Sequence, residues 1–185
     1  MLTSEAVKIW NYERLLSELP SQSRYEIRNA HLIDIPSPSE KHQELVFKLT
    51  LLFGNYIIQN KLGKFYQAPF DVILDNTNVV QPDLLLVLNE NKEIIKERGV
   101  FGSPDLVVEI VSKGSVIRDY VEKKEDYERF GVKEYWLIDP QNELIQVFAL
   151  QNTKYVSFSY ADEDGTVKSK ILDGFEMNWN DIFKQ

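Results

Sequence analysis

The segment PDLVVEIV, at residues 104–111, limits the possible folds of this chain more than any other feature. Apolar side chains fill consecutive positions, so a β-strand formed here must be covered on both faces, as in the centre of a sheet flanked by helices. Because side chains alternate along a strand, Glu109 shares one face with Asp105 and lies mid-strand among valines. An isolated carboxylate in such a place costs several kcal/mol. We therefore expect Glu109 to be ion-paired, bound to a metal ion, protonated, or at the mouth of a cleft.

A second segment, PDLLLVL at residues 82–88, repeats the same frame without the glutamate. Asp105 and Glu109 are four strand residues apart, so their Cα atoms are separated by about 13 Å. Two oxygen ligands of one hard cation each lie about 2–2.6 Å from it, so Asp105 is too distant to share a metal ion with Glu109 directly. If the two segments form neighbouring strands, about 4.8 Å apart, the carboxylate of Asp83 can converge with Glu109. Asp83 is otherwise explained as simple turn chemistry at the start of a strand.

The predicted helix over residues 115–130, which ends at Gly131, carries a lysine within its apolar stripe. Lys123 occupies a missing step of that stripe and Lys124 falls outside it; the apolar members are Val116, Tyr120, Tyr127 and Phe130. A lysine that points inward needs an anion, which two carboxylates beside a metal ion or a substrate phosphate would supply. The alternative is that Lys123 extends along the apolar surface until its ammonium group reaches solvent.

Hydrophobic periodicity and turn residues predict the remaining elements. A long helix is expected from His42 to near Gly63, with Ser39 and Glu40 supplying capping groups. The other expected elements are an amphipathic helix or pair of turns over residues 4–19, a hairpin around Asn29-Ala30, neighbouring strands in FYQAPFDVIL and VVQPDLLLVL, a loop with a short helix in NENKEIIKERGVFGS, strands in EYWLIDP, LIQVFAL and KYVSFSY, and a tail, ILDGFEMNWNDIF, that packs against the body.

The composition indicates one soluble globular domain, because the chain has 185 residues, no low-complexity tract and abundant aromatic residues. The formal net charge of −8 gives no general attraction to a phosphate backbone, so nucleic-acid binding would need a local basic surface or bound cations. The absence of cysteine excludes disulfides, thiolate metal sites and a cysteine nucleophile. Neither a signal peptide nor a membrane-spanning run is recognisable, and we expect a cytoplasmic protein with no membrane partner.

Four segments in order, QPDLLLV, SPDLVVEIVS, RDYVEKKEDYERFGVKEYWLIDP and LDGFEMNWNDIF, resemble the Uma-type restriction endonuclease family of the PD-(D/E)XK nuclease superfamily. The resemblance covers most of the chain and is strongest from Gln81 to Pro140. It implies an α/β fold of a single domain over residues 1–185, with a restriction-endonuclease-like mixed central β-sheet flanked by α-helices. The N-terminal helix and hairpin would occupy residues 1–40, the catalytic core residues 41–150, and the C-terminal strands and tail residues 151–185.

The same resemblance implies a catalytic site in which Asp83 and Glu109 hold Mg²⁺, with Mn²⁺ able to substitute, while water attacks a phosphodiester. The superfamily usually has a lysine two residues after the glutamate, where this chain has Val111. The family pattern instead looks as though the lysine has moved to the following helix, which matches Lys123. Lys113 is a rival for this role. In this chain Ser112 is followed by Lys113-Gly114, whereas the family usually shows Ser-Pro at this point.

Two further residues are candidates for accessory roles or for structural ones. His42 begins the long helix on its apolar stripe, so it could face the cleft and contact substrate or metal-bound water, or pack as a hydrogen-bonded edge residue. Asp119, one turn before Lys123, is most simply its salt-bridge partner on the helix surface, although it could also position that lysine. Because Asn29-Ala30 replaces the family's usual Asp-Gly turn, no role is transferred to Glu26.

These features favour a Mg²⁺-dependent endonuclease that hydrolyses DNA phosphodiester bonds through Asp83, Glu109 and Lys123. The resemblance also implies a homodimer, since such enzymes often pair to cut both strands. Two alternatives remain: a non-catalytic module that keeps the nuclease fold for DNA binding or protein interaction, and a hydrolase of another phosphoester. Three polar residues at otherwise apolar positions favour an enzyme, because a non-catalytic site could exchange them for hydrophobic residues without loss.

Overall fold

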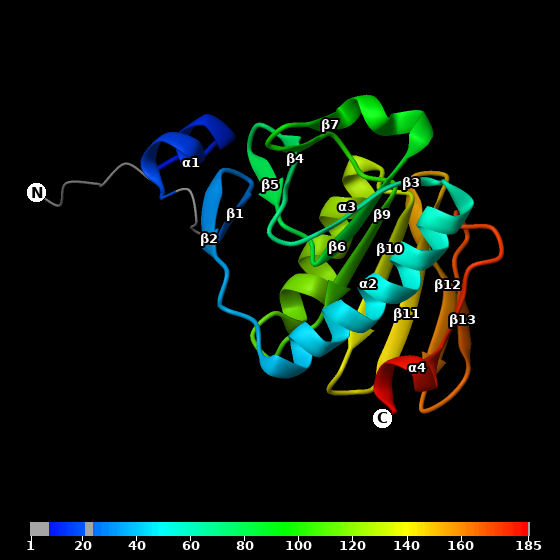
Figure 1. Cartoon of the computed structure of the whole chain (residues 1–185). Helices are drawn as coiled ribbons and strands as arrows, with labels where there is room; N and C mark the ends of the chain where they lie inside the picture. The colour runs from blue at the N-terminus through cyan, green and yellow to red at the C-terminus, as the bar shows by residue number, and fades with distance from the viewer. Residues whose placement is uncertain (1–7, 21–23, 185) are drawn as a thin grey trace, which may run out of the picture.

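The computed structural model describes residues 8–20 and 24–184, and its centre is a mixed six-stranded β-sheet with α2 lying across one face (Figure 1). The strand order is β12-β11-β10-β9-β6-β3, and only β9 and β10 run parallel. The mixed sheet flanked by helices that the sequence predicts is therefore confirmed. The strands are β3 (Gly63–Gln67), β6 (Leu84–Leu88), β9 (Leu106–Ile110), β10 (Glu134–Asp139), β11 (Leu144–Gln151) and β12 (Lys154–Asp162).

The sequence did not reveal a second, smaller six-stranded sheet, with the order β2-β1-β5-β4-β8-β7. Strands β4 and β5, which we expected beside β6, belong to this smaller sheet instead. The reason is that Val79 of β5 pairs with Ile27 of the N-terminal hairpin. Its strands are β1 (Tyr25–Arg28), β2 (His31–Asp34), β4 (Asp71–Asp75), β5 (Asn78–Val80), β7 (Ile95–Lys96) and β8 (Gly99–Phe101). A two-stranded sheet joins β13 (Thr166–Lys168) and β14 (Glu176–Asn178).

The helices are short except for α2. They are α1 (Tyr12–Glu18), α2 (Glu40–Asn60), the 3₁₀-helix η1 (Asn89–Ile94), the π-helix η2 (Arg118–Lys123), α3 (Lys124–Phe130) and α4 (Trp179–Phe183). The predicted helix over residues 4–19 is only partly right, since residues 4–7 lie outside the described part and α1 begins at Tyr12. The side chain of Asn11 fixes that start by accepting a hydrogen bond from the backbone N–H of Arg14. In the segment predicted as a loop with a short helix, η1 is present and strands β7 and β8 follow it.

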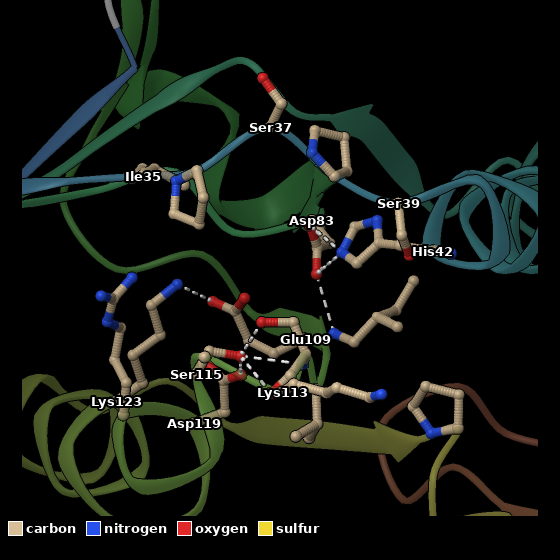
Figure 2. Close-up of a pocket in the computed structure, with 18 of the residues that line it drawn as sticks. Ile35, Ser37, Ser39, His42, Asp83, Glu109, Lys113, Ser115, Asp119 and Lys123 are labelled. Atoms are coloured by element: carbon tan, nitrogen blue, oxygen red, sulfur yellow. Dashed lines mark hydrogen bonds and ion pairs between the residues drawn. The ribbon is translucent and has the colours of Figure 1, made fainter.

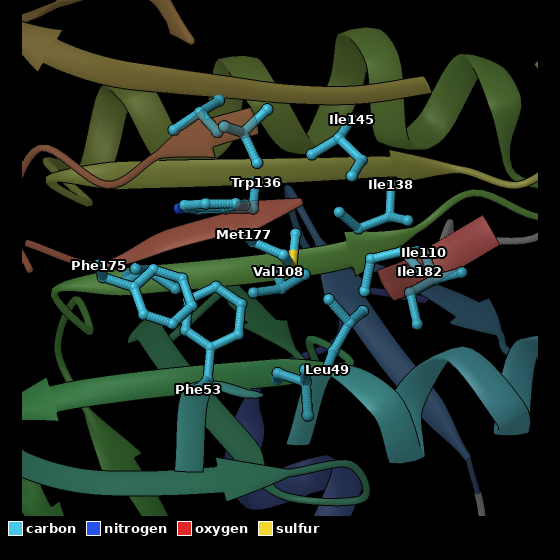
Figure 3. Close-up of a cluster of buried hydrophobic side chains, with 14 of the residues drawn as sticks. Leu49, Phe53, Val108, Ile110, Trp136, Ile138, Ile145, Phe175, Met177 and Ile182 are labelled. Carbon is cyan, nitrogen blue, oxygen red and sulfur yellow. The ribbon is translucent and has the colours of Figure 1, made fainter. Parts of the chain in front are cut away.

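Strand β9 lies in the interior of the central sheet, and all five of its residues are buried. Its Leu106, Val108 and Ile110 pack in one hydrophobic cluster with α2, while Val107 packs on the opposite face with Tyr127 of α3. Figure 3 shows the first cluster, where Leu49 and Phe53 of α2 approach Val108 and Trp136. The predicted alternation of side chains along residues 104–111 is thus confirmed.

Helix α2 begins and ends close to its predicted limits. The side chain of Ser39 accepts a hydrogen bond from the backbone N–H of His42, which confirms the predicted cap. The helix ends because Lys61 adopts a left-handed conformation with φ 54°. Gly63 then enters β3, where a Cβ atom would lie 2.2 Å from the carbonyl oxygen of Val87, so only glycine allows this approach.

The C-terminal tail packs against the body as predicted, and a buried carboxylate fixes it there. Phe175, Met177 and Trp179 belong to the main hydrophobic cluster. Glu134, which is fully buried, accepts hydrogen bonds from the backbone N–H of Lys170 at 2.6 Å and of Ile171 at 3.1 Å. None of the helices described here combines the length and the apolar character that spanning a membrane requires.

Candidate active site

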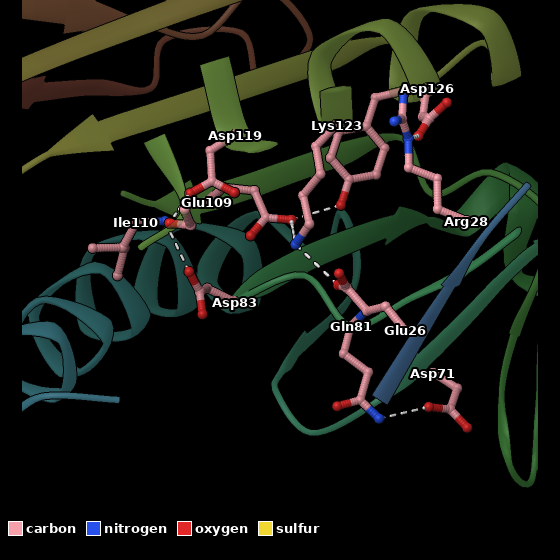
Figure 4. Close-up of polar contacts among 12 residues, drawn as sticks. Glu26, Arg28, Asp71, Gln81, Asp83, Glu109, Ile110, Asp119, Lys123 and Asp126 are labelled. Atoms are coloured by element: carbon pink, nitrogen blue, oxygen red, sulfur yellow. Dashed lines mark hydrogen bonds and ion pairs between the residues drawn. The ribbon is translucent and has the colours of Figure 1, made fainter. Parts of the chain in front are cut away.

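The two carboxylates singled out from the sequence lie on neighbouring strands of the central sheet. Strands β6 and β9 pair antiparallel with Leu84 opposite Val108, and one further step of this register places Asp83 opposite Glu109. Oδ2 of Asp83 accepts a hydrogen bond from the backbone N–H of Ile110 at 2.8 Å. Figure 4 shows how this bond holds Asp83 against the strand that carries Glu109. The two segments are therefore neighbours, as the pairing of Asp83 with Glu109 requires.

Asp105, the aspartate nearest in sequence to Glu109, has a separate structural role. Its Oδ2 accepts a hydrogen bond from the backbone N–H of Leu88 at 2.7 Å. Its Oδ1 accepts another from the side chain of Asn91 at 2.7 Å and forms an ion pair with Lys133 at 2.8 Å. Asp105 thus ties β9 to the end of β6 and to η1, away from the cavity that Glu109 lines.

Lys123 points into the protein and contacts two buried carboxylates. Its Nζ lies 2.9 Å from Oε1 of Glu109 and 3.0 Å from Oε1 of Glu26. Only 7% of Lys123 is exposed, so the alternative in which this lysine reaches solvent is wrong. Tyr127, four residues later, donates a hydrogen bond from its hydroxyl to the same oxygen of Glu109 at 2.6 Å. The carboxylate and the ammonium group are therefore held in one fixed arrangement.

Glu26 is the residue of this site that the sequence did not select. It lies on β1, is 2% exposed, and accepts a hydrogen bond from the backbone N–H of Gln81 at 3.0 Å. The altered turn that argued against Glu26 does not displace it, because Asn29 and Ala30 both adopt left-handed conformations, with φ of 48° and 63°. The one available signal was a glutamate beside Ile27 in a short apolar strand, and that signal is weak.

The helix that carries Lys123 contains the π-helical stretch η2, a feature that is frequent at functional sites. Its two buried residues are Asp119 and Lys123. The predicted helix over residues 115–130 and its end at Gly131 are otherwise confirmed. Val116, however, is 42% exposed and does not belong to the buried stripe. The wider π-turn shifts the phase of the residues before it, which a constant helical period does not anticipate.

Asp119 is not a surface partner of Lys123, because it is 3% exposed and its carboxylate accepts a hydrogen bond from the hydroxyl of Ser115. That hydroxyl also accepts a hydrogen bond from the backbone N–H of Ser112 at 2.9 Å, which fixes the turn between β9 and the helix. Burial raises the pKa of Asp119 from 3.8 to about 6, against the opposing effects of Lys123 and Ser115. Asp119 instead lines the same cavity as Glu109.

A cavity of about 610 Å³ opens over these carboxylates (Figure 2). His42, in the first turn of α2, faces it with Nε2 3.2 Å from the carboxylate of Asp83. Lys113, in the exposed turn after β9, also lines the cavity, but the ion pair with Glu109 is made by Lys123. Three more cationic side chains line it, those of Arg24, Lys41 and Arg118.

The floor of the cavity has more negative than positive charge. Burial raises the pKa of Glu109 well above its usual value, and the carboxylates of Asp83, Asp119 and Glu26 raise it further, against Lys123. For Lys123, burial lowers the pKa, but the charges of Glu109, Glu26 and Asp119 outweigh burial and raise it overall. Lys123 therefore stays protonated, with the carboxylates of Glu109, Glu26 and Asp119 around its buried ammonium group.

The donor set and this charge excess fit a hard divalent cation, which prefers carboxylate oxygens. Among residues 8–20 and 24–184, no three His, Cys, Asp or Glu side chains are arranged to hold a metal ion. Asp83 and Glu109 are two carboxylates on adjacent strand positions that could serve as protein ligands, with water or phosphate oxygens completing the coordination. Mg²⁺ is commonly bound in this way, through one or two carboxylates.

Comparison with known families decides where the chain belongs. The family model Uma2, described as "Putative restriction endonuclease", matches residues 11–180. The chain belongs to the Uma2 family. The resemblance seen in the sequence is thereby confirmed, and the match includes every residue of the cavity floor. A comparison with curated proteins gives no match.

A solved structure shares the fold of this Uma2 protein. It is a crystal structure from Anabaena variabilis, described as a putative nuclease belonging to DUF820, with a TM-score of 0.77 and 16% sequence identity. The superposition covers 94% of this chain and 97% of the other. At this identity the similarity concerns the fold alone, and it confirms the mixed α/β architecture.

Proposed function

We propose that this Uma2 protein is a metal-dependent endonuclease that hydrolyses DNA phosphodiester bonds in the cavity above Asp83, Glu109 and Lys123. One observation carries the proposal: three separate segments bring the half-buried Asp83 and the buried Glu109 and Lys123 together beneath an open cavity lined with cationic groups. A solvated ion-pair network would not need a buried lysine among three buried carboxylates, because burying these charges is costly. Membership of the Uma2 family supports the reaction class.

The residues of the cavity floor would have separate roles in this reaction. Asp83 and Glu109 would hold Mg²⁺, or Mn²⁺ in its place, which when bound neutralises phosphate charge and lowers the pKa of water. Lys123, protonated and fixed by Glu109 and Glu26, would stabilise the charge that develops on the phosphorus centre or orient the attacking water. His42 lies within hydrogen-bond reach of Asp83 and would contact the substrate or that water.

Unpaired polar atoms in the cavity wall support a polar, extended ligand. Nε of Arg24, Nδ1 of His42 and Oε1 of Gln81 are buried and lack hydrogen-bond partners, and all three residues line the cavity. A buried polar group without a partner costs stability, so these atoms would be satisfied by a ligand or by water. The side chains of Arg24, Lys41, Lys113 and Arg118 form a local basic wall suited to a phosphate backbone despite the acidic chain.

The experiment is cleavage of supercoiled plasmid with and without Mg²⁺ or Mn²⁺, using the wild type and the variants Asp83→Asn, Glu109→Gln and Lys123→Met. The two Pro-Asp segments offer a matched control, Asp105→Asn, which is expected to lower stability but to keep cleavage once folded. Metal-dependent cleavage that all three site variants lose supports the proposal. Equal activity in wild type and site variants would refute it, and a panel of small phosphodiesters would reveal a different phosphoester substrate.

The competing function is a non-catalytic module that uses the nuclease fold to bind DNA. The observation that favours it is the absence, among the described residues, of a ready three-ligand metal group. It predicts DNA binding that is unaffected by EDTA, together with no cleavage at any metal concentration. Binding measured by fluorescence anisotropy beside the plasmid assay separates the two functions.

A further inference from the structure

A second cavity, of about 660 Å³, adjoins the first and has no part in the proposed reaction. Glu26 lines the first cavity and its neighbour Tyr25 lines the second, because successive side chains of β1 point to opposite faces. Sites for small organic groups have this size and are mostly apolar, with a few polar groups. The lining here combines aromatic and apolar side chains with arginines, and includes Tyr12, Leu15, Leu19, Phe70, Arg24 and Arg98.

The two cavities share a wall that contains Arg24 and Gln81. Nε2 of Gln81 donates a hydrogen bond to Oδ1 of Asp71 at 2.8 Å (Figure 4). Because a carboxylate only accepts, this contact fixes the amide with its oxygen turned away from Asp71. Oε1 of Gln81 and Nε of Arg24 are buried and have no hydrogen-bond partner among residues 8–20 and 24–184. The wall therefore holds one acceptor and one donor whose burial is unfavourable until a ligand or water binds them.

Aromatic rings line the second cavity beside this wall. Tyr25 is half-buried and, within the described part of the chain, belongs to none of the three hydrophobic clusters of the fold. Phe70 is also half-buried and lies against Tyr66, with 4.5 Å between the ring centroids. Rings of this kind, next to free hydrogen-bonding groups, suit a planar heterocycle that stacks on its faces and forms hydrogen bonds along its edge.

We propose that the second cavity binds an unpaired nucleobase of the DNA strand whose phosphate lies in the first cavity. The inference rests on the proposed function, which puts a phosphate backbone over Asp83. In a nucleotide the base and the phosphate are attached to one sugar, so one group lies on each side of Arg24 and Gln81. The edge of an unpaired base carries donors and acceptors that match these two side chains, and its faces stack on Tyr25.

This assignment determines which form of DNA the protein selects. A base in an intact duplex must lose its pairing and stacking before it enters a cavity, whereas a single strand or a mismatched site needs much less free energy for this step. Phosphate contacts are available in every form of DNA and do not provide this discrimination. The second cavity therefore selects single-stranded or locally unpaired DNA over a perfect duplex.

The first test compares a labelled single-stranded oligonucleotide with a strand of the same length in which every position is abasic, by fluorescence anisotropy in EDTA. Both strands carry the same phosphates, so a difference in affinity reports the bases alone. The abasic strand and the perfect duplex should each bind at least about 10-fold more weakly than the base-bearing strand. Equal affinity for the abasic and base-bearing strands overturns the proposal.

This measurement separates the base site from the nuclease reaction, because it needs neither metal nor cleavage. A protein that cuts DNA but binds both strands equally lacks the base site and keeps the proposed function. A protein that prefers the base-bearing strand and never cuts DNA has the base site and lacks the proposed reaction.

Tyr25→Ala tests the stacking ring. It should weaken binding of the base-bearing strand about 10-fold and affect the abasic strand much less, since only the first has bases to stack. Tyr25→Phe keeps the ring and should recover most of this loss. Phe158→Ala, which removes an exposed aromatic from β12 at the edge of the central sheet, is the matched control and should bind like the wild type. Circular dichroism checks folding. An equal loss on both strands would give Tyr25 a structural role and overturn the stacking site.

Gln81→Met tests the shared wall. It removes the free acceptor but keeps the backbone N–H that Glu26 accepts, so the cavity floor retains this contact. The base-bearing strand should bind about 5-fold more weakly, through loss of one hydrogen bond. With Mg²⁺, the wild type should cut a duplex with a central mismatched bubble at least about 10-fold faster than a perfect duplex, and Gln81→Met should reduce that ratio. Equal cutting of both substrates by the wild type overturns the proposal.

Discussion

Glu109 of β9 and Lys123 of η2 form a buried ion pair, with 2.9 Å between Oε1 and Nζ. The pair joins the central strand of the large sheet to the helix beside it, and Glu26 attaches the smaller sheet to the same ammonium group at 3.0 Å. Both carboxylates are almost fully buried. The cavity floor is therefore also a joint between the two sheets, so its substitution affects stability as well as chemistry.

Lys123→Met is expected to abolish most of the activity and to destabilise the fold. It removes the positive charge from between Glu26 and Glu109, and breaking a buried pair costs about 3–5 kcal/mol. Loss of one electrostatic donor lowers kcat by about 10²–10³-fold. Chemical denaturation measures the first effect and plasmid nicking the second. Lys113→Met is the matched control and should keep full activity. If Lys123→Met is fully active and Lys113→Met is inactive, Lys113 is the catalytic lysine.

Glu26→Gln tests whether Glu26 positions Lys123. The amide oxygen can still accept from the backbone N–H of Gln81, but it no longer pairs its charge with Lys123. We expect kcat to fall about 10-fold with KM almost unchanged, the pattern of a residue that orients another catalytic group. A rise in KM at constant kcat would show that Glu26 contacts the substrate instead. Steady-state cleavage of a labelled oligonucleotide separates the two outcomes.

The stability of the metal-free protein is expected to depend on Asp119 between about pH 4 and 6. Because burial raises the pKa of Asp119 from 3.8 to about 6, the folded state binds this proton more tightly than the unfolded state. The resulting stability is complete below pH 4 and is lost as the pH rises through 6, by up to roughly 3 kcal/mol. Asp119→Asn should flatten this part of the curve in urea unfolding measured at several pH values. An identical pH dependence in the variant would contradict the burial of this carboxylate.

Mg²⁺ is expected to stabilise the wild type against thermal unfolding. A cation that binds only the folded state adds about 2.7 kcal/mol at 100 times its dissociation constant. Asp83→Asn and Glu109→Gln should lose this stabilisation, whereas Asp105→Asn should start from a lower melting temperature and still show the full shift. Differential scanning fluorimetry with a magnesium titration measures all four proteins. A shift that survives loss of both ligands would locate the cation elsewhere.

The sequence identified most of the central sheet and part of the candidate site through local patterns. Apolar residues on both faces of PDLVVEIV predicted a covered interior strand, and β9 is one. The helical stripe predicted that Lys123 points inward, and it does. The spacing of residues along a strand excluded Asp105 as a direct partner of Glu109. In the structure, Asp105 instead accepts a hydrogen bond from the last residue of β6. Each of these inferences needed only the period of one element.

Other features depended on which elements become neighbours. The second sheet forms because Ile27 of the hairpin pairs with Val79 of β5, residues 52 positions apart in the chain. Glu26 reaches Lys123 only through that pairing, so its own strand gave no sign of a functional position. Asp119 looked like a surface residue because its helix gives no sign of how deeply its neighbours bury it, although it lies one turn before Lys123 and is buried beside it.

The sequence by itself determined the interior strand with its glutamate, the inward lysine and the exclusion of Asp105 as a partner of Glu109, because strand and helix periods are local properties. The tertiary structure alone decided that Glu26, Asp119 and His42 share one cavity with them. Long-range pairing sets these positions, and no local period encodes it. It also decided the excess of negative charge on the cavity floor, since the charge of a site depends on which buried groups are brought together from distant parts of the chain.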